Sequence, residues 1–247
     1  MKRSWIMGSL IVGAVIVLWE VGVWVAGTPV YLLPAPSDVA RQLADDLGGL
    51  IPAAGVTLSE ALGGLLLGGG IGLALAVVIT LWGHLEQGVM SLALLIKSTP
   101  IIAVIPIFTI WMGFGAGPKV VVTALLTFFP VLINALEGFR SVDPAIADWF
   151  RSIDAPPRQY FTQARWPSAR PYLFAALKVV TPLALIGAVV AEWMGASSGL
   201  GRKMWLAYTN LDMPSLFAAV IVLTLLSAGL YRLVVAAERR SLHWATS

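Results

Sequence analysis

Cysteine is absent from the 247-residue sequence, which excludes disulfide bonds and thiolate metal sites. Charge is also scarce: 12% of the residues are charged and 58% are hydrophobic, whereas soluble domains carry about 25% charge. Several apolar runs of about 20 residues are long enough to cross ~30 Å of hydrocarbon. The composition therefore predicts one all-α, multi-pass membrane domain over residues 1–247, without a separate soluble domain for catalysis.

Nucleotide and metalloprotease motifs are missing as well. The sequence has no Gly-x-x-x-x-Gly-Lys-Ser/Thr loop and no His-Glu-x-x-His, so it is not expected to bind ATP itself or to act as an enzyme. No inverted repeat or row of ionisable residues along one span points to a secondary transporter. We expect no catalytic residue, metal, cofactor or nucleic-acid partner. A transporter driven by a separate ATPase, and an ATPase-independent transporter or channel, both remain open.

Apolar patterning predicts six transmembrane helices. The first run is interpreted as a retained span rather than a signal peptide, because it is long and contains Trp19 and Glu20. A short amphipathic surface helix is expected over 38–50. Gly64, Gly68 and Gly72 form a small-residue stripe that predicts close helix packing within the chain. The expected spans are residues 5–26, 56–82, 86–112 (interrupted by Pro100 and Pro106), 118–138, 170–194 and 214–236.

The distribution of Lys and Arg predicts the orientation of the chain. If the N-terminus is cytoplasmic, nine basic residues fall on the inner side and four on the outer side. The inner set is Lys2, Arg3, Arg140, Arg151, Arg158, Arg165, Arg170, Arg239 and Arg240, and the outer set is Arg41, Lys119, Arg202 and Lys203. Both termini and the polar segment 143–167 are therefore expected in the cytoplasm.

Segment 143–167 is polar in an otherwise apolar chain, so it must leave the bilayer. Asp143 as N-cap and Pro144 at the first position begin a helix, which is expected to end at Asp154-Ala-Pro-Pro. A second short helix is expected over 158–165, with a turn back into the membrane at Trp166-Pro167. Two short helices that protrude from a bundle offer a contact surface to another protein.

This segment resembles the cytoplasmic "EAA" loop of binding-protein-dependent ABC importer permeases. Asp148-Trp149-Phe150 falls on the family's Glu-Ala-Ala, Asp154 on its Gly, and Trp166-Pro167 on its Leu-Pro. The spacing agrees, while Trp149 and Phe150 are bulkier than alanine and Asp154 implies a left-handed residue or a different turn. Segments 97–115, 128–134 and 191–201 resemble the nitrate/sulfonate/taurine branch, and 139–143 and 186–192 resemble members linked to thiamine-precursor pyrimidines and riboflavin.

The resemblance implies a MetI-like type I permease fold in a bacterial-type cytoplasmic (inner) membrane. It implies a homodimer with two cytoplasmic ATPase subunits, which bind ATP-Mg, and an extracytoplasmic substrate-binding protein. The solute would be small and polar: a thiamine-precursor pyrimidine, a riboflavin-like compound, a sulfonate or taurine, or nitrate. The residues expected to couple to the ATPase are Asp143, Asp148, Trp149, Phe150, Arg151, Ser152, Asp154, Ala155 and Arg158.

Charged residues inside the spans are candidates for the translocation pathway, because an amine or carboxylate facing lipid is costly. Lys97, with Ser98 and Thr99, either lines the pathway or has a structural partner. Glu192 and Trp193 either line an outer gate or anchor the span at the interface. Two further charges, Glu20 and Lys178, are interpreted as structural.

Overall fold

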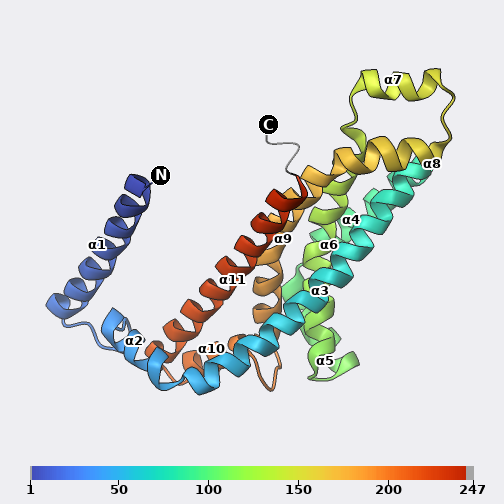
Figure 1. Ribbon diagram of the computed structural model, residues 1–247. Coiled ribbons are helices and arrows are strands. Elements are labelled where there is room, and N and C mark those ends of the chain that lie inside the picture. Colours follow the sequence, from blue (N-terminus) through green and yellow to red (C-terminus); the bar gives the residue numbers. More distant parts are fainter. Residues whose placement is uncertain (1, 243–247) are drawn as a thin grey trace.

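The computed structural model describes residues 2–242, and this part of the chain folds into helices with no strand (Figure 1). Short 3₁₀ and π segments lie at Gly83–Leu85 and Phe161–Arg165. The α-helices are α1 (Lys2–Ala26), α2 (Pro36–Asp45), α3 (Leu47–Leu81), α4 (Glu86–Ser98), α5 (Ile101–Met112), α6 (Ala116–Arg140), α7 (Pro144–Ser152), α8 (Pro157–Tyr160), α9 (Trp166–Trp193), α10 (Leu200–Thr209) and α11 (Met213–Ser241).

Four long apolar helical runs are able to cross a membrane: α3, α6, the continuous run Pro157–Trp193, and α11. Helices α4 and α5 form a pair bent by 91°, which would make a fifth crossing. In α1, the apolar stretch Leu10–Ala26 is shorter than these. The all-α membrane architecture and the break at Pro100 are confirmed. The interruption expected at Pro106 is absent, because α5 continues through that residue. The count of six spans stays a prediction.

Helix α6 lies between α3 and α9 and packs closely against both. The glycine stripe on α3 makes this possible: a Cβ at Gly64 would lie 2.3 Å from Thr123 Cβ, and one at Gly68 would lie 2.2 Å from the Ala124 carbonyl oxygen. At Gly72 the Phe128 carbonyl oxygen would be 2.6 Å away. The stripe thus serves packing within the chain, as the sequence predicts.

Two boundaries differ from the expectation. The surface helix α2 ends at Asp45 and α3 already begins at Leu47, so the second span is longer and the surface helix shorter than expected. The turn expected at Trp166-Pro167 is absent, because α8 continues into α9 through the π segment. Proline disrupts a regular helix at the carbonyl four residues before it, and for Pro167 this carbonyl, of Gln163, lies inside the π segment.

Helix α1 stands apart from the bundle in Figure 1 and meets it near one end. Trp19 packs on Phe217 with ring centroids 5.6 Å apart. The Glu20 carboxylate accepts hydrogen bonds from the backbone N–H (3.0 Å) and hydroxyl (2.8 Å) of Ser37 at the start of α2. Lys178 forms an ion pair with Glu238 at 2.9 Å, which links α9 to α11. Both charges interpreted as structural therefore have partners in the chain.

Candidate functional site

The two ends of the bundle carry different polar features, and both are candidate sites. Helices α7 and α8 lie at one end, which we call the α7 end, and α2 and α10 lie at the other, the α10 end (Figure 1). The residues expected to couple to an ATPase lie at the α7 end. Glu192 and Trp193 lie at the C-terminal end of α9, from which the chain continues to α10.

At the α7 end, α7 is a capped amphipathic helix. The Asp143 carboxylate accepts a hydrogen bond from the Ala145 N–H at 2.8 Å, and Pro144 follows it. Phe150 points inward and packs against Tyr160, with ring centroids 5.4 Å apart. The exposed large apolar side chains of α7 and its C-cap are Ile146, Trp149 and Ile153, at helical spacing of three and four. They form an exposed apolar stripe along α7 next to Phe150; the sequence analysis singled out only Trp149.

The turn after α7 has the left-handed residue that the resemblance implied. Asp154 adopts φ 49°, a region in which an acidic residue is tolerated better than most others. The Ala155 N–H donates to the Phe150 carbonyl at 3.1 Å and closes the helix. Ser152 and Arg158 are exposed, as are Asp148 and Arg151, which pair with each other at 2.7 Å. The nine residues expected to couple to an ATPase thus lie together on α7, the turn after it and the start of α8.

A polar pocket of about 670 Å³ separates α7 from the end of α3. Arg165 lines it, donates to the Thr80 carbonyl oxygen at 2.9 Å, and lies 5.0 Å from the Tyr160 ring centroid. Arg165 therefore anchors the loop to α3. In the sequence it counted only as an inner positive charge, since its partner lies 85 residues away.

Lys97, Ser98 and Thr99 lie at the end of α4, beside the 91° bend, and all three are exposed. The Lys97 ammonium lies 4.4 Å from the centroid of the Phe129 ring. It makes no ion pair with the described residues. An unpaired ammonium at the edge of a single chain is compatible with a water-filled pathway, and its pathway role stays a prediction.

Glu192 at the α10 end is fully buried. Its carboxylate accepts hydrogen bonds from the Thr57 hydroxyl at 2.7 Å and from the Gly201 N–H in the first turn of α10. The Leu200 N–H donates to the Thr57 hydroxyl at 2.8 Å. Glu192 thus holds the N-terminus of α10 against α3 and α9. Trp193 is exposed, with its ring centroid 6.4 Å from that of Trp205.

Two glycines make room for this carboxylate. A Cβ at Gly199 would lie 2.3 Å from the Glu192 carboxyl, and one at Gly201 would lie 2.4 Å from the Val189 carbonyl oxygen. Gly199 also has φ 111°, which side chains rarely adopt. The Gly-Leu-Gly sequence therefore allows the chain to close over Glu192. Within one chain the predicted pathway residues are therefore on different elements: Lys97 lies at the end of α4, and Glu192 lies at the end of α9.

The structure adds two charged residues to this network that sequence reasoning missed. Glu60 is buried in α3 and interacts electrostatically with Glu192, while its Oε2 atom has no hydrogen-bond partner among the described residues. Lys119 was assigned to an outer loop segment but is buried in α6. Its ammonium donates to the carbonyl oxygens of Phe114 (2.6 Å), Gly115 (2.7 Å) and Gly195 (3.3 Å). Lys119 also interacts electrostatically with both glutamates. Glu60 could have been singled out in the sequence, because it is an acidic residue inside the apolar run 56–82.

Segment 195–199 matches a spacing that also occurs in hydrolase active sites. Gly195, Ser197 and Gly199 match Gly-x-Ser-x-Gly, the nucleophile-elbow spacing of α/β-hydrolases, in which a strand leads through a sharp turn into a helix. Here helix α9 precedes the match and α10 follows it, and the described part of the chain has no strand. The spacing therefore does not form an elbow.

The fold and the two ends define a multi-pass membrane protein with an exposed amphipathic helix at one end, and comparison with known proteins identifies its family. Residues 68–243 match the family described as binding-protein-dependent transport system inner membrane component, and the chain belongs to this family. It is an ABC transporter permease, a transport subunit of the inner membrane. Membership implies an ATPase and a substrate-binding protein as partners.

Individual relatives agree with this assignment. The chain is 35% identical over 232 residues to the formylaminopyrimidine transport permease ThiX of Halalkalibacterium halodurans, covering 92% of this chain and 91% of the relative. It is 34% identical to the riboflavin transport system permease RibX of Chloroflexus aurantiacus, covering 94% and 87%. It is 28% identical to the putative aliphatic sulfonates transport permease SsuC of Bacillus subtilis, covering 100% and 90%. The branch suggested by the sequence motifs is confirmed.

Proposed function

We propose that this chain is the permease subunit of an ATP-driven importer, which passes a small polar solute from an extracytoplasmic binding protein to the cytoplasm. The observation that carries the proposal is the exposed apolar stripe of α7. The stripe consists of Ile146, Trp149 and Ile153, and the same projecting helix also carries the exposed charges of Asp148 and Arg151. An apolar stripe with a charged rim is suited to the groove of a soluble partner.

In this proposal the α7 end faces the cytoplasm, in agreement with the excess of Lys and Arg there, and both termini lie on that side. ATP-Mg is bound by the partner ATPase. The solute class comes from the relatives, whose names specify formylaminopyrimidine, riboflavin and aliphatic sulfonates. These compounds, together with other thiamine-precursor pyrimidines, taurine and nitrate, share small size and polar groups.

We further propose that two copies form the pathway. Between Met7 and Val25, helix α1 exposes apolar side chains, and α5 exposes Ile102, Ile107, Ile110 and Trp111. Such surfaces are available to lipid or to a second copy. Lys97 next to the bend would then face the space between the copies, where water stabilises its charge. A homodimer with two ATPases completes the assembly.

The test combines substitutions in α7 with measurements of uptake and ATPase binding. Trp149→Ala, Asp148→Lys and Asp154→Pro are expected to insert in the membrane yet to lower ATP-dependent uptake at least tenfold. ATPase recovery on the purified permease should fall in parallel for Trp149→Ala, because a largely exposed anchor is removed. Trp24→Ala on α1 is the control, since Trp24 is also an exposed tryptophan, at 84% against 55% for Trp149, but lies on a helix apart from α7.

Normal uptake and normal ATPase recovery in all three α7 variants would contradict the proposal. The alternative function, a transporter or channel that needs no ATPase, makes the opposite prediction. Under it, the purified chain alone in vesicles would move solute at the full rate without ATP.

Lys97→Met tests the pathway independently. Removing the ammonium while keeping the side-chain length should leave expression and ATPase recovery unchanged and alter the uptake rate by about tenfold, because an interaction with passing solute or pore water is lost. Lys178→Met serves as a contrast, since Lys178 has a structural partner in Glu238. Unchanged uptake in Lys97→Met would remove Lys97 from the pathway.

A further inference from the structure

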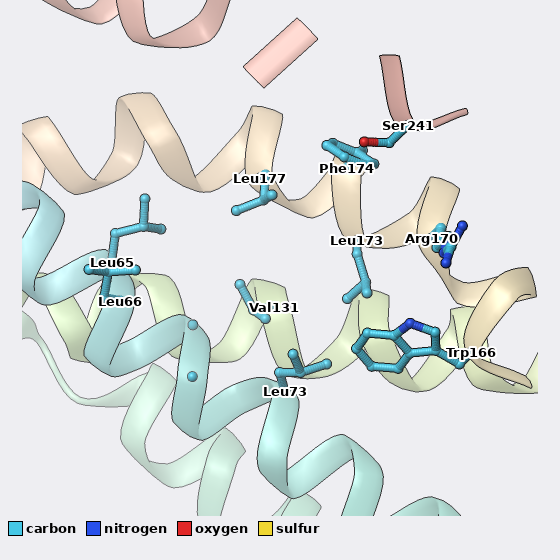
Figure 2. Close-up of a pocket in the computed structure, with 12 residues that line it drawn as sticks. Leu65, Leu66, Leu73, Val131, Trp166, Arg170, Leu173, Phe174, Leu177 and Ser241 are labelled. Atoms are coloured by element: carbon cyan, nitrogen blue, oxygen red, sulfur yellow. The ribbon is translucent and has the colours of Figure 1, made fainter. Parts of the chain in front are cut away.

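A groove on the side of the bundle reaches toward the α7 end but is not lined by α7. This groove of about 710 Å³ lies between α3, α6, α9 and the C-terminal end of α11 (Figure 2). Its walls are leucines and a valine: Leu65 and Leu73 from α3, Val131 from α6, and Leu173 and Leu177 from α9. A groove with such walls favours an apolar occupant and disfavours a polar solute.

Glycine on α3 keeps the groove open. A Cβ at Gly70 would meet no atom within 4 Å, and a Cβ at Gly69 would meet only Val131, at 3.8 Å. By contrast, Gly68 is pressed against α6. Gly68 thus serves helix packing, whereas Gly69 and Gly70 leave space that a larger residue could fill without strain. Close packing of α3 on α6 therefore requires Gly68 but does not require the open space at Gly69 and Gly70.

One end of the groove is polar. Figure 2 shows Trp166, Arg170 and Ser241 at the same end, away from Leu65 and Leu66. Arg170 is exposed and makes no hydrogen bond or ion pair with the residues that the structure describes, whereas nearby Arg165 is bound to Thr80. A tryptophan and an arginine at one end of an apolar run are typical of the membrane–water interface. The groove therefore has the polarity of a single lipid molecule.

The basic residues at the polar end of the groove indicate which class of lipid it binds. A guanidinium forms paired hydrogen bonds with phosphate oxygens, and Arg239 on α11 adds positive charge two residues before Ser241. Basic pockets between membrane helices favour anionic head groups. Helix α1 of a second copy fits less well, because its one acidic residue, Glu20, already accepts two hydrogen bonds from Ser37.

We propose that this groove binds one anionic phospholipid, with an acyl chain along the leucine walls and the phosphate on Arg170. The site lies on the flank of α9, the helix that continues from the α7 loop. A bound lipid would therefore support the junction between that loop and the membrane helices. The proposal concerns lipid binding and does not depend on which solute, if any, is transported.

The test measures lipid retained by the full chain, isolated in its complex and titrated with phosphatidylglycerol or phosphatidylcholine in nanodiscs, by native mass spectrometry. Arg170→Gln should weaken retention of phosphatidylglycerol about fivefold, because one interfacial basic residue contributes about 1 kcal/mol to anionic lipid binding. Retention of phosphatidylcholine should fall less, because its cationic choline offsets the charge of its phosphate. Gly70→Phe should abolish retention of both lipids by filling the groove. Arg41→Gln and Gly55→Phe are the controls, because Arg41 is on α2 and a Cβ at Gly55 also meets nothing within 4 Å.

Equal retention of phosphatidylglycerol by the wild-type chain, Arg170→Gln and Gly70→Phe would overturn the proposal. A protein occupant is checked separately, using the absence of native cysteine. If Val17→Cys on α1 of one copy forms a disulfide with Leu66→Cys of another, a second copy fills the groove and the lipid site is rejected. Absence of that cross-link together with loss of lipid in Gly70→Phe supports the lipid site.

Discussion

The two ends of the bundle use the same kinds of charged residues in opposite ways. At the α10 end, Glu192, Lys119 and Glu60 are 0%, 2% and 4% exposed. At the α7 end, the side chains of Arg151 and Asp148 are 78% and 70% exposed. Buried charges must be paired or hydrogen-bonded, because desolvation is costly, and so they determine local structure. Exposed charges contribute little to stability and remain available to a partner.

This contrast suggests a division of labour within one subunit. The carboxylate of Glu192 and the ammonium of Lys119 together hold three chain segments: the N-terminus of α10, the segment after α5, and the turn at Gly195. The α10 end is therefore built as a rigid cap. The α7 loop instead attaches to the bundle through Arg165 and Phe150 and leaves its apolar stripe exposed.

Removing the helix contact that joins the two ends should have the largest effect. A leucine at Gly68 would place its Cβ 2.2 Å from the backbone of α6, which cannot give way as a flexible side chain would. Gly68→Leu is expected to destabilise the chain by about 3 kcal/mol or more. Thermal unfolding in detergent measures this, with Gly55→Leu as the control on the same helix. Equal melting temperatures would show that α3 and α6 are less tightly packed than described.

Breaking the α10 end should have the next largest effect. Glu192→Ala leaves the Thr57 hydroxyl and the Gly201 N–H without their acceptor, at a cost of about 2–3 kcal/mol in unfolding free energy. Glu192→Gln keeps one acceptor oxygen and should lose less. The same detergent unfolding assay applies, supplemented by protease cleavage at segment 195–201. If alanine and glutamine behave alike and near wild type, the buried network is not what holds α10.

Disrupting the ion pair on α7 should have the smallest effect on stability. Asp148→Ala removes the pair with Arg151, and its expected cost is within about 0.5 kcal/mol because both groups are in water. The loss of unfolding free energy should therefore be several-fold larger for Glu192→Ala than for Asp148→Ala when both are measured in the same assay. A loss at Asp148 as large as that at Glu192 would erase the distinction drawn between the ends.

Much of the α7 end could be predicted from the sequence, because its signals are local. The N-cap Asp143, the proline after it and the left-handed Asp154 are each determined by a few adjacent residues. The apolar runs and the break at Pro100 are equally local. The regular spacing of Gly64, Gly68 and Gly72 predicted close packing, but only the tertiary structure identified α6 as the partner.

The α10 end depended on contacts that no local pattern reveals. Thr57 and Glu192 are 135 residues apart and meet only because α3 and α9 pack together with α6. Lys119 looked like a loop cation until the carbonyls of Phe114, Gly115 and Gly195 were seen to surround it. The sequence by itself therefore determined where the long apolar helices lie and which polar segment projects from them, since hydropathy and turn chemistry act over short stretches. Tertiary packing decided which buried charges became partners, because burial and long-range distance are properties of the assembled helices.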